Sequence, residues 1–174
     1  SLAAITAQFM ITPCSCSLSH ADAPPGAALR ASLHELESER FRHQMQRIFH
    51  LDLADRPVAV TLRGQCAARD GRVHTDSKSK VLSLLIYLNE GWSSREGQLR
   101  LLKGEDGFDT APVEIPATLG SLVAFRRSDE SWHGHSSFIG QRRALQFNYL
   151  QSYRASVVGL LRHRISAVTK QLVA

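Results

Sequence analysis

The 174-residue chain is predicted to be mainly β with flanking helices (α+β), folded as a double-stranded β-helix, or jelly roll. Three observations support this prediction. Short apolar or alternating segments recur between residues 57 and 150, and clusters of Gly, Pro and Asp separate them. Apolar residues at helical spacing occur on either side of that region. Short strands at this spacing favour two packed sheets with Greek-key connections.

The composition is typical of one globular domain, which we expect to span residues 1–174. The chain is 43% hydrophobic and 21% charged, with a net charge of +5, and its length allows a substantial buried core. The basic residues are scattered, except for Arg162 to Arg164, so no nucleic-acid partner is expected.

The cysteines and the apolar segments indicate in which compartment the protein is expected. Cys14, Cys16 and Cys66 lack the spacing of a zinc ribbon, so we expect reduced thiols in a cytoplasmic protein. Pro13 interrupts the mildly apolar N-terminal segment, and no run approaches the length of a membrane span. We therefore expect neither a signal peptide nor a membrane partner.

The N-terminal part is predicted to support the core. A first strand lies within residues 1–20, where Ala7, Phe9 and Ile11 alternate. Apolar residues then recur at helical spacing over residues 27–50, with a change of face near Ser38 that indicates a bend or a split.

The catalytic core is expected over residues 57–150, and its strands follow in order. The most apolar strand covers residues 81–89 and has two faces, which indicates a strand buried on both sides. One face carries Leu82, Leu84, Ile86 and Leu88, and the other carries Val81, Ser83, Leu85 and Tyr87. A C-terminal amphipathic helix over residues 154–173 is expected to pack outside the larger sheet. The other predicted strands cover residues 57–63, 72–76, 97–102, 113–116, 120–125 and 142–149.

Three residues in this core have the character of metal ligands. In an extended strand, His74 and Asp76 point the same way, so both can face one ion. A distant histidine, His133, completes two imidazoles and one carboxylate, the ligand set of non-haem Fe(II) sites with open positions. An arginine follows His133 on the last strand, where it can hold a carboxylate in a planar two-pronged contact.

Residues 71–149 resemble the prolyl 4-hydroxylase-like branch of the Fe(II)/2-oxoglutarate dioxygenases, which includes the hypoxia-inducible-factor prolyl hydroxylases. The likeness is an ordered series of motifs and not the His-x-Asp pair alone. In chain order the motifs are His74-Thr75-Asp76, Tyr87-Leu88-Asn89, Gly97-Gln98-Leu99-Arg100, Gly120 to Phe125, Ser128-Asp129, His133 and Arg142.

The resemblance implies roles for five residues. His74, Asp76 and His133 would bind Fe(II), and Arg142 and Tyr87 would bind the distal carboxylate of 2-oxoglutarate. It implies hydroxylation of an aliphatic C–H with O2, giving succinate and CO2, with ascorbate as an optional addition.

Two assignments have competitors. His135 could face the same way as His133, but His133 lies nine residues before Arg142, which fits the family spacing. Arg143 competes with Arg142. Alternation places Arg143 with Leu145, Phe147 and Tyr149, an apolar set suited to packing, and Arg142 with the small and polar set Ala144, Gln146 and Asn148.

The sequence leaves two substrate classes open. One is a protein or peptide, in which a prolyl residue would be hydroxylated, and the other is a small molecule, such as a free amino acid or sugar. Substrate contacts are expected from the loops at residues 66–72, 89–97 and 126–131. Trp92 and Trp132 flank two of these loops and could stack on a ring or fill a corner. A further alternative is a non-catalytic, cupin-like binding jelly roll, because fold alone does not define function.

Overall fold

The computed structural model describes residues 4–8, 26–105 and 113–152. The predicted C-terminal helix at 154–173 lies outside the described residues, as do Phe9 and Ile11 of the predicted first strand. A strand does occupy part of that N-terminal segment, at Ala4–Gln8 (β1).

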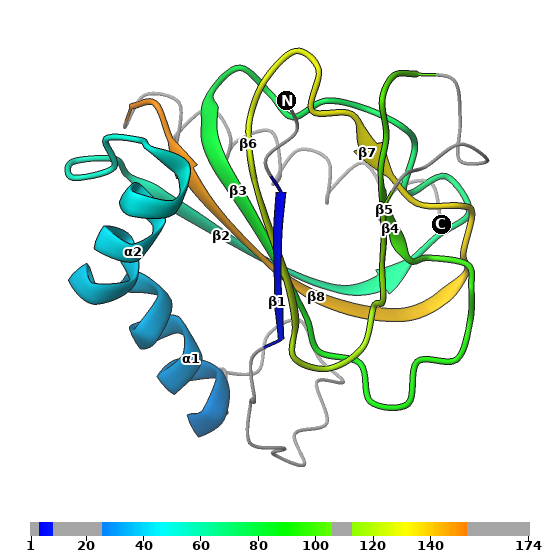
Figure 1. Cartoon of the computed structure of the whole chain (residues 1–174). Helices are drawn as coiled ribbons and strands as arrows, with labels where there is room; N and C mark the ends of the chain where they lie inside the picture. Colours follow the sequence, from blue (N-terminus) through cyan, green and yellow to red (C-terminus); the bar gives the residue numbers. More distant parts are fainter. Residues whose placement is uncertain (1–3, 9–25, 106–112, 153–174) are drawn as a thin grey trace, which may run out of the picture.

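Two antiparallel sheets form the body of the molecule, as Figure 1 shows. The larger sheet has the strand order β1-β6-β3-β8-β2, and the smaller has the order β5-β4-β7. This mainly β architecture confirms the predicted jelly roll. Beside β1, the strands are β2 (Val58–Cys66), β3 (Lys80–Tyr87), β4 (Leu99–Leu101), β5 (Val113–Ile115), β6 (Ser121–Arg126), β7 (His133–Gly134) and β8 (Gly140–Leu150).

Two helices cover the outer face of the larger sheet. They are α1 (Ala27–Glu37) and α2 (Glu39–Phe49), and the split that separates them falls at Ser38, as predicted. Ser38 has extended backbone angles, and its hydroxyl accepts a hydrogen bond from Phe41 N over 3.1 Å, so it caps α2. The chain leaves α2 at His50, which is in the left-handed conformation with φ 50°.

The larger sheet separates two apolar clusters. One lies between this sheet and the helices, where Phe41, Met45 and Phe49 of α2 pack on residues of β3, β6 and β8. The other lies between the two sheets and includes Leu85, Tyr87, Leu99, Phe125 and Ala144. Burial of both clusters removes apolar surface from water, which is the main driving force for this arrangement.

Strand β3 lies in the middle of the larger sheet and is buried on both faces, as predicted. Leu82, Leu84 and Ile86 point toward the helices, while Leu85 and Tyr87 point between the sheets. The prediction for Val81 was wrong. It was expected on the face of Leu85 and Tyr87, but it packs against the helix-side cluster, because the pairing of β3 with β8 shifts register between residues 80 and 82.

Some strand limits also differ from the predictions. Strand β2 extends to Cys66, and β4 begins at Leu99 instead of residue 97. The segment at residues 72–76 is not a full strand and pairs through a single bridge at His74. No helix in the described parts of the chain is long and apolar enough to cross a membrane.

Candidate active site

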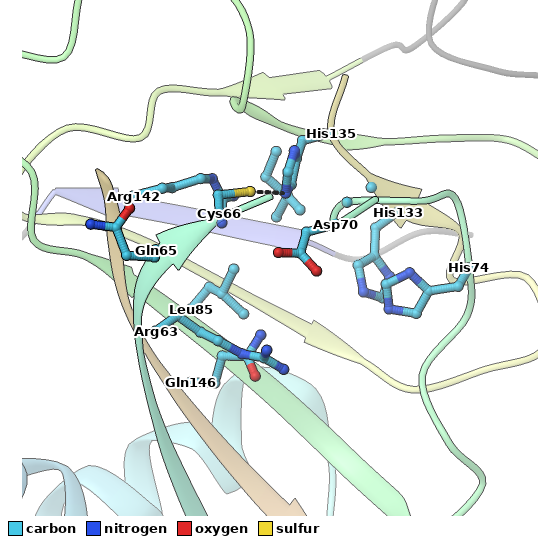
Figure 2. A pocket seen from close by; sticks show the side chains of 13 residues that line it. Arg63, Gln65, Cys66, Asp70, His74, Leu85, His133, His135, Arg142 and Gln146 are labelled. Carbon is cyan, nitrogen blue, oxygen red and sulfur yellow. Dashed lines mark hydrogen bonds between the residues drawn. The ribbon is translucent and has the colours of Figure 1, made fainter. Parts of the chain in front are cut away.

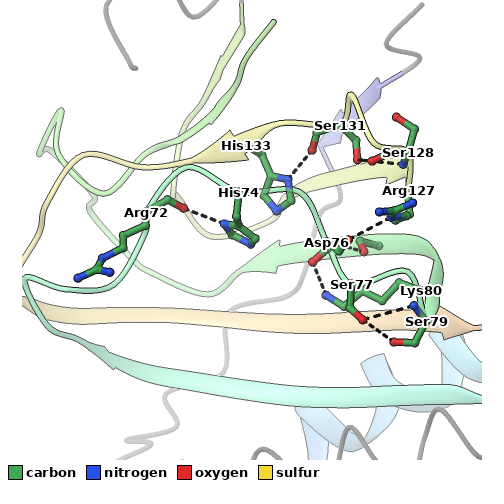
Figure 3. Close-up of polar contacts among 11 residues, drawn as sticks. Arg72, His74, Asp76, Ser77, Ser79, Lys80, Arg127, Ser128, Ser131 and His133 are labelled. Atoms are coloured by element: carbon green, nitrogen blue, oxygen red, sulfur yellow. Dashed lines mark hydrogen bonds and ion pairs between the residues drawn. The ribbon is translucent and has the colours of Figure 1, made fainter. Parts of the chain in front are cut away.

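A single bridge between two distant segments brings His74 and His133 together. The backbone N–H of each residue donates to the carbonyl of the other over 3.0 Å. The ring centroids consequently lie 4.4 Å apart, and Figure 3 shows the two imidazoles side by side. His133 begins β7 and is buried, whereas His74 is exposed.

Backbone carbonyls orient both imidazoles. Nδ1 of His74 lies 2.7 Å from the Arg72 carbonyl, and Nδ1 of His133 lies 2.9 Å from the Ser131 carbonyl. A carbonyl only accepts, so each Nδ1 is the donor, and each Nε2 is the nitrogen left to bind a metal. Burial lowers the pKa of His133, which favours the neutral ligand form.

Asp76 supplies the carboxylate and is held by two side chains from the start of β3. Its Oδ1 lies 2.6 Å from Lys80 Nζ (Figure 3), and its Oδ2 accepts a hydrogen bond from the Ser83 hydroxyl. Burial raises the pKa of Asp76, but the Lys80 ammonium, His133 and these hydrogen bonds outweigh it, so the pKa is lowered overall. The carboxylate is therefore ionised at neutral pH.

Together these three residues form a compact group of potential metal ligands. One ligand atom from each of His74, Asp76 and His133 lies within 4.8 Å of the others. Two imidazoles and one ionised carboxylate fit Fe(II) in chemistry, because this donor set is that of the non-haem oxygenase facial triad.

Arg142 and Tyr87 lie buried at another part of the same interior. Arg142 donates from Nε to the Gly97 carbonyl over 2.7 Å and from Nη2 to the Tyr87 hydroxyl over 3.0 Å. Burial raises the pKa of Tyr87 to about 12, although Arg142 opposes the shift, so the hydroxyl keeps its proton. No acidic residue in the described part of the chain pairs with Arg142. A buried guanidinium without a counter-ion fits an anionic cosubstrate.

One cavity of about 190 Å³ joins these parts. Its lining includes His74, His133 and Arg142, and Figure 2 shows these side chains around it. Leu85 and Leu99 supply apolar walls. Potential metal ligands and a cation that can bind an anion therefore line the same pocket. A cosubstrate that chelates a metal at one end and carries a carboxylate at the other needs both.

His135 has a different environment from His133 and does not belong to the ligand group. Its Nδ1 lies 2.9 Å from the Ser136 carbonyl, and its Nε2 lies 3.9 Å from Cys66 Sγ. Its ring also lies directly over Gly71, where an added Cβ would be 2.2 Å from His135 Cε1. His135 therefore forms part of the pocket wall, and burial lowers its pKa.

The tryptophans do not line this pocket. Trp92 packs against Phe138 with ring centroids 4.8 Å apart, and its Nε1 donates to the Ser94 carbonyl over 2.8 Å. This contact is rim packing. Of the three loops expected to meet substrate, the one at residues 66–72 contributes described residues to the pocket lining, through Cys66, Asp70 and Gly71.

Sequence reasoning did not identify the residues that hold Asp76. Ser83 was the signal available, since it is the one polar residue among the apolar positions of its strand and lies on the same face as Leu85 and Tyr87. Lys80 offered no comparable signal, because a lysine at the start of a strand is usually a solvated charge.

The comparisons with known proteins agree with this geometry. The sequence matches the model of the 2OG-Fe(II) oxygenase superfamily over residues 49–150, more than half of the chain. The chain therefore belongs to this superfamily, and the expected class of enzyme, an oxygenase that depends on Fe(II) and 2-oxoglutarate, is confirmed.

Solved structures show the same fold. A prolyl 4-hydroxylase from Pseudomonas putida is similar with a TM-score of 0.53 and 24% identity, over 75% of this chain and 71% of that one. A 2OG-Fe(II) oxygenase family oxidoreductase from Burkholderia pseudomallei is similar with a TM-score of 0.50 and 13% identity, over 72% of this chain and 59% of that one. No curated protein matches the chain in a sequence search.

Proposed function

We propose that the protein hydroxylates an aliphatic C–H bond and converts 2-oxoglutarate to succinate and CO2, with one atom of O2 entering each of the product alcohol and succinate. In this proposal His74, Asp76 and His133 hold Fe(II), while Arg142 and Tyr87 hold the distal carboxylate of 2-oxoglutarate. The observation that supports it is one pocket lined both by His74 and His133 of the ligand group and by Arg142, which is hydrogen-bonded to Tyr87.

Bound Fe(II) would supply the redox chemistry, and the protein's own residues would orient the reactants. The carbonyls of Arg72 and Ser131 hold each Nε2 ready as a ligand. Lys80 and Ser83 hold the Asp76 carboxylate in place. Preorganised ligands of this kind lower the cost of ordering the site when the metal binds.

The cosubstrate end of the pocket would work by electrostatics. Arg142 is buried, so its attraction for a carboxylate is screened much less than on the surface. Tyr87 accepts a hydrogen bond from Arg142 and keeps its own proton, which it can donate to the same carboxylate. Two donors would then converge on one anion, while Leu85 and Leu99 contribute apolar surface to the same pocket.

Two substrate classes fit the proposed chemistry. The fold shared with the Pseudomonas putida prolyl 4-hydroxylase supports a prolyl residue. The small volume of the pocket supports a small molecule, such as a free amino acid.

The experiment is an assay of succinate formed from 2-oxoglutarate by Fe(II)-loaded protein after air is admitted, with and without ascorbate. Pools of prolyl peptides and of small metabolites are added separately. We expect succinate above the level of a His74→Ala control, with stimulation by one pool. Binding of neither Fe(II) nor 2-oxoglutarate would overturn the proposal and favour a non-catalytic jelly roll.

A further inference from the structure

A second arginine lines the same pocket as Arg142. Arg63 lies on β2 directly opposite Ala144 of β8 in the antiparallel register. Residues opposite each other in a sheet face the same side, and Ala144 belongs to the cluster between the sheets. Arg63 therefore points inward, and Figure 2 shows its side chain beside Gln146 at the pocket.

The pairing of β2 with β8 determines that the side chain of Arg63 points inward. The preceding residue, Leu62, lies opposite Leu145 on the helix side of the sheet. The register of β2 and β8 shifts immediately after Arg63, between residues 63 and 65. Irregularities of this kind re-aim side chains and are frequent next to functional sites.

Arg63 and Arg142 differ in their contacts within the described part of the protein. No hydrogen bond or ion pair joins Arg63 to another residue in the described ranges of the chain, whereas Arg142 donates to Gly97 and Tyr87. Arg63 is also exposed, so it can meet a molecule that enters the pocket. A guanidinium binds a carboxylate through two parallel hydrogen bonds, and a charged group at a pocket entrance attracts the opposite charge.

The two arginines serve two different anions if the proposed function holds. Arg142 and Tyr87 are occupied by the distal carboxylate of 2-oxoglutarate, and the other end of that molecule lies at the metal ligands. Arg63 is then left for the second molecule of the reaction, the substrate.

We infer that Arg63 binds the free carboxylate of the substrate and that the substrate is an α-amino acid. This inference rests on the proposed function and selects between its two substrate classes. The cavity is small, about 190 Å³, and this favours a small substrate over a peptide. Asp70 lines the same pocket, so both charges of an α-amino acid meet an opposite charge there. A prolyl residue inside a peptide has neither charge, because both groups are amides.

The test measures binding without turnover. Protein loaded with Mn(II) and 2-oxoglutarate, free of O2, is titrated calorimetrically with each proteinogenic α-amino acid, including free proline, and with the matching carboxamides. We expect at least one amino acid to bind roughly tenfold or more tightly than its carboxamide, since a charge-assisted hydrogen-bonded contact is lost. Arg63→Gln should remove this preference, and Arg63→Lys should restore part of it.

The controls separate this inference from the proposed function. Arg63→Gln should bind Mn(II) and 2-oxoglutarate with affinities close to those of the wild type, and it should unfold at the same temperature because Arg63 is exposed. Arg69→Gln, on the turn at residues 67–70 and outside the pocket lining, should keep the preference for the carboxylate.

Several results would overturn the inference. One is a wild-type protein that binds Mn(II) and 2-oxoglutarate but binds no amino acid more tightly than its carboxamide; the proposed function would survive. Preferential binding of a capped prolyl peptide would show that the substrate is a peptide and not a small molecule. Loss of 2-oxoglutarate binding in Arg63→Gln would assign Arg63 to the cosubstrate. A wild-type protein that binds neither Mn(II) nor 2-oxoglutarate would overturn the proposed function and this inference together.

Discussion

Arg142 and Tyr87 are hydrogen-bonded to each other between the two sheets, with 3.0 Å between Arg142 Nη2 and the Tyr87 hydroxyl oxygen. The residues are 55 positions apart in the sequence and lie on the neighbouring strands β8 and β3. Because the guanidinium donates this bond, the hydroxyl proton of Tyr87 remains available for an anion. This geometry is the reason why we propose the pair as the site for a carboxylate.

Tyr87→Phe removes that hydroxyl and leaves the ring. We expect the affinity for 2-oxoglutarate to fall about tenfold, which corresponds to about 1.4 kcal/mol, while the Mn(II) affinity stays unchanged. Isothermal titration of metal-free protein with Mn(II), and of Mn(II)-loaded protein with 2-oxoglutarate, measures the two affinities. Tyr149→Phe is the matched control, because Tyr149 lies in the cluster on the helix side. An equal loss in both variants would contradict the role of Tyr87.

In the proposed function, Arg142→Ala leaves the distal carboxylate of the cosubstrate without a cation. We expect the affinity for 2-oxoglutarate to fall by about a hundredfold or more, since breaking a buried ion pair costs about 3–5 kcal/mol. Arg143→Ala should change the affinity by less than about threefold on the same scale, because the hydrogen bond that Arg143 gives to Asn89 comes from its backbone. A larger loss for Arg143→Ala would show that the alternation along β8 was assigned in the wrong register.

His133→Ala should abolish tight metal binding, whereas His135→Gln should retain it. The reason is that His133 shares the ligand group with His74 and Asp76, while the ring nitrogens of His135 face Ser136 and Cys66. Titration with Mn(II) or Co(II) at pH 7.5 measures the difference. Metal binding that survives in His133→Ala and disappears in His135→Gln would exchange the two assignments.

Gly71→Ala should lower the free energy of unfolding by about 1–3 kcal/mol. Gly71 has φ +82°, a conformation that residues with a side chain rarely adopt, and the new Cβ would overlap the His135 ring. Urea denaturation measures the change. Gly64→Ala is the control, because its Cβ would meet no atom within 4 Å. Equal stability of the two variants would show that the contact between Gly71 and His135 is not maintained in solution.

The stability of the metal-free protein should rise with pH toward neutrality. Burial lowers the pKa of His133 and of His135 below the ordinary value of 6.5. Between the lowered pKa and 6.5 the unfolded chain binds more protons than the folded one, so the free energy of unfolding increases with pH in that interval. Urea midpoints measured in EDTA should therefore be higher at pH 7 than at pH 5.5. His135→Gln should show a shallower slope, and a flat profile in the wild type would contradict the prediction.

Local patterns predicted much of the fold and of the site. The helical spacing over residues 27–50 predicted the break that occurs at Ser38. The alternation in the last strand predicted that Leu145 and Phe147 pack against a neighbouring layer, which the structure shows to be the helices, and that Arg142 faces a pocket. These predictions succeeded because the repeat of a helix or a strand assigns side chains to faces without knowledge of the rest of the chain.

Other features depended on irregularities that a regular repeat does not contain. Val81 lies on the opposite face from the one predicted, because the pairing of β3 and β8 shifts beside it. The segment at residues 72–76 pairs through one bridge only, so extended geometry alone did not describe how His74 meets its partner. Irregular pairing of this kind results from contacts between strands, which no single segment encodes.

By itself the sequence determined the family, the set of candidate ligands and their order, from His74 and Asp76 to His133 and Arg142. Only the tertiary structure decided which of these side chains meet. The bridge from His74 to His133, the contact of Arg142 with Tyr87 and the inward turn of Arg63 each join segments far apart in the chain. Local periodicity selects the face on which a side chain lies, but long-range pairing and packing select what that face meets.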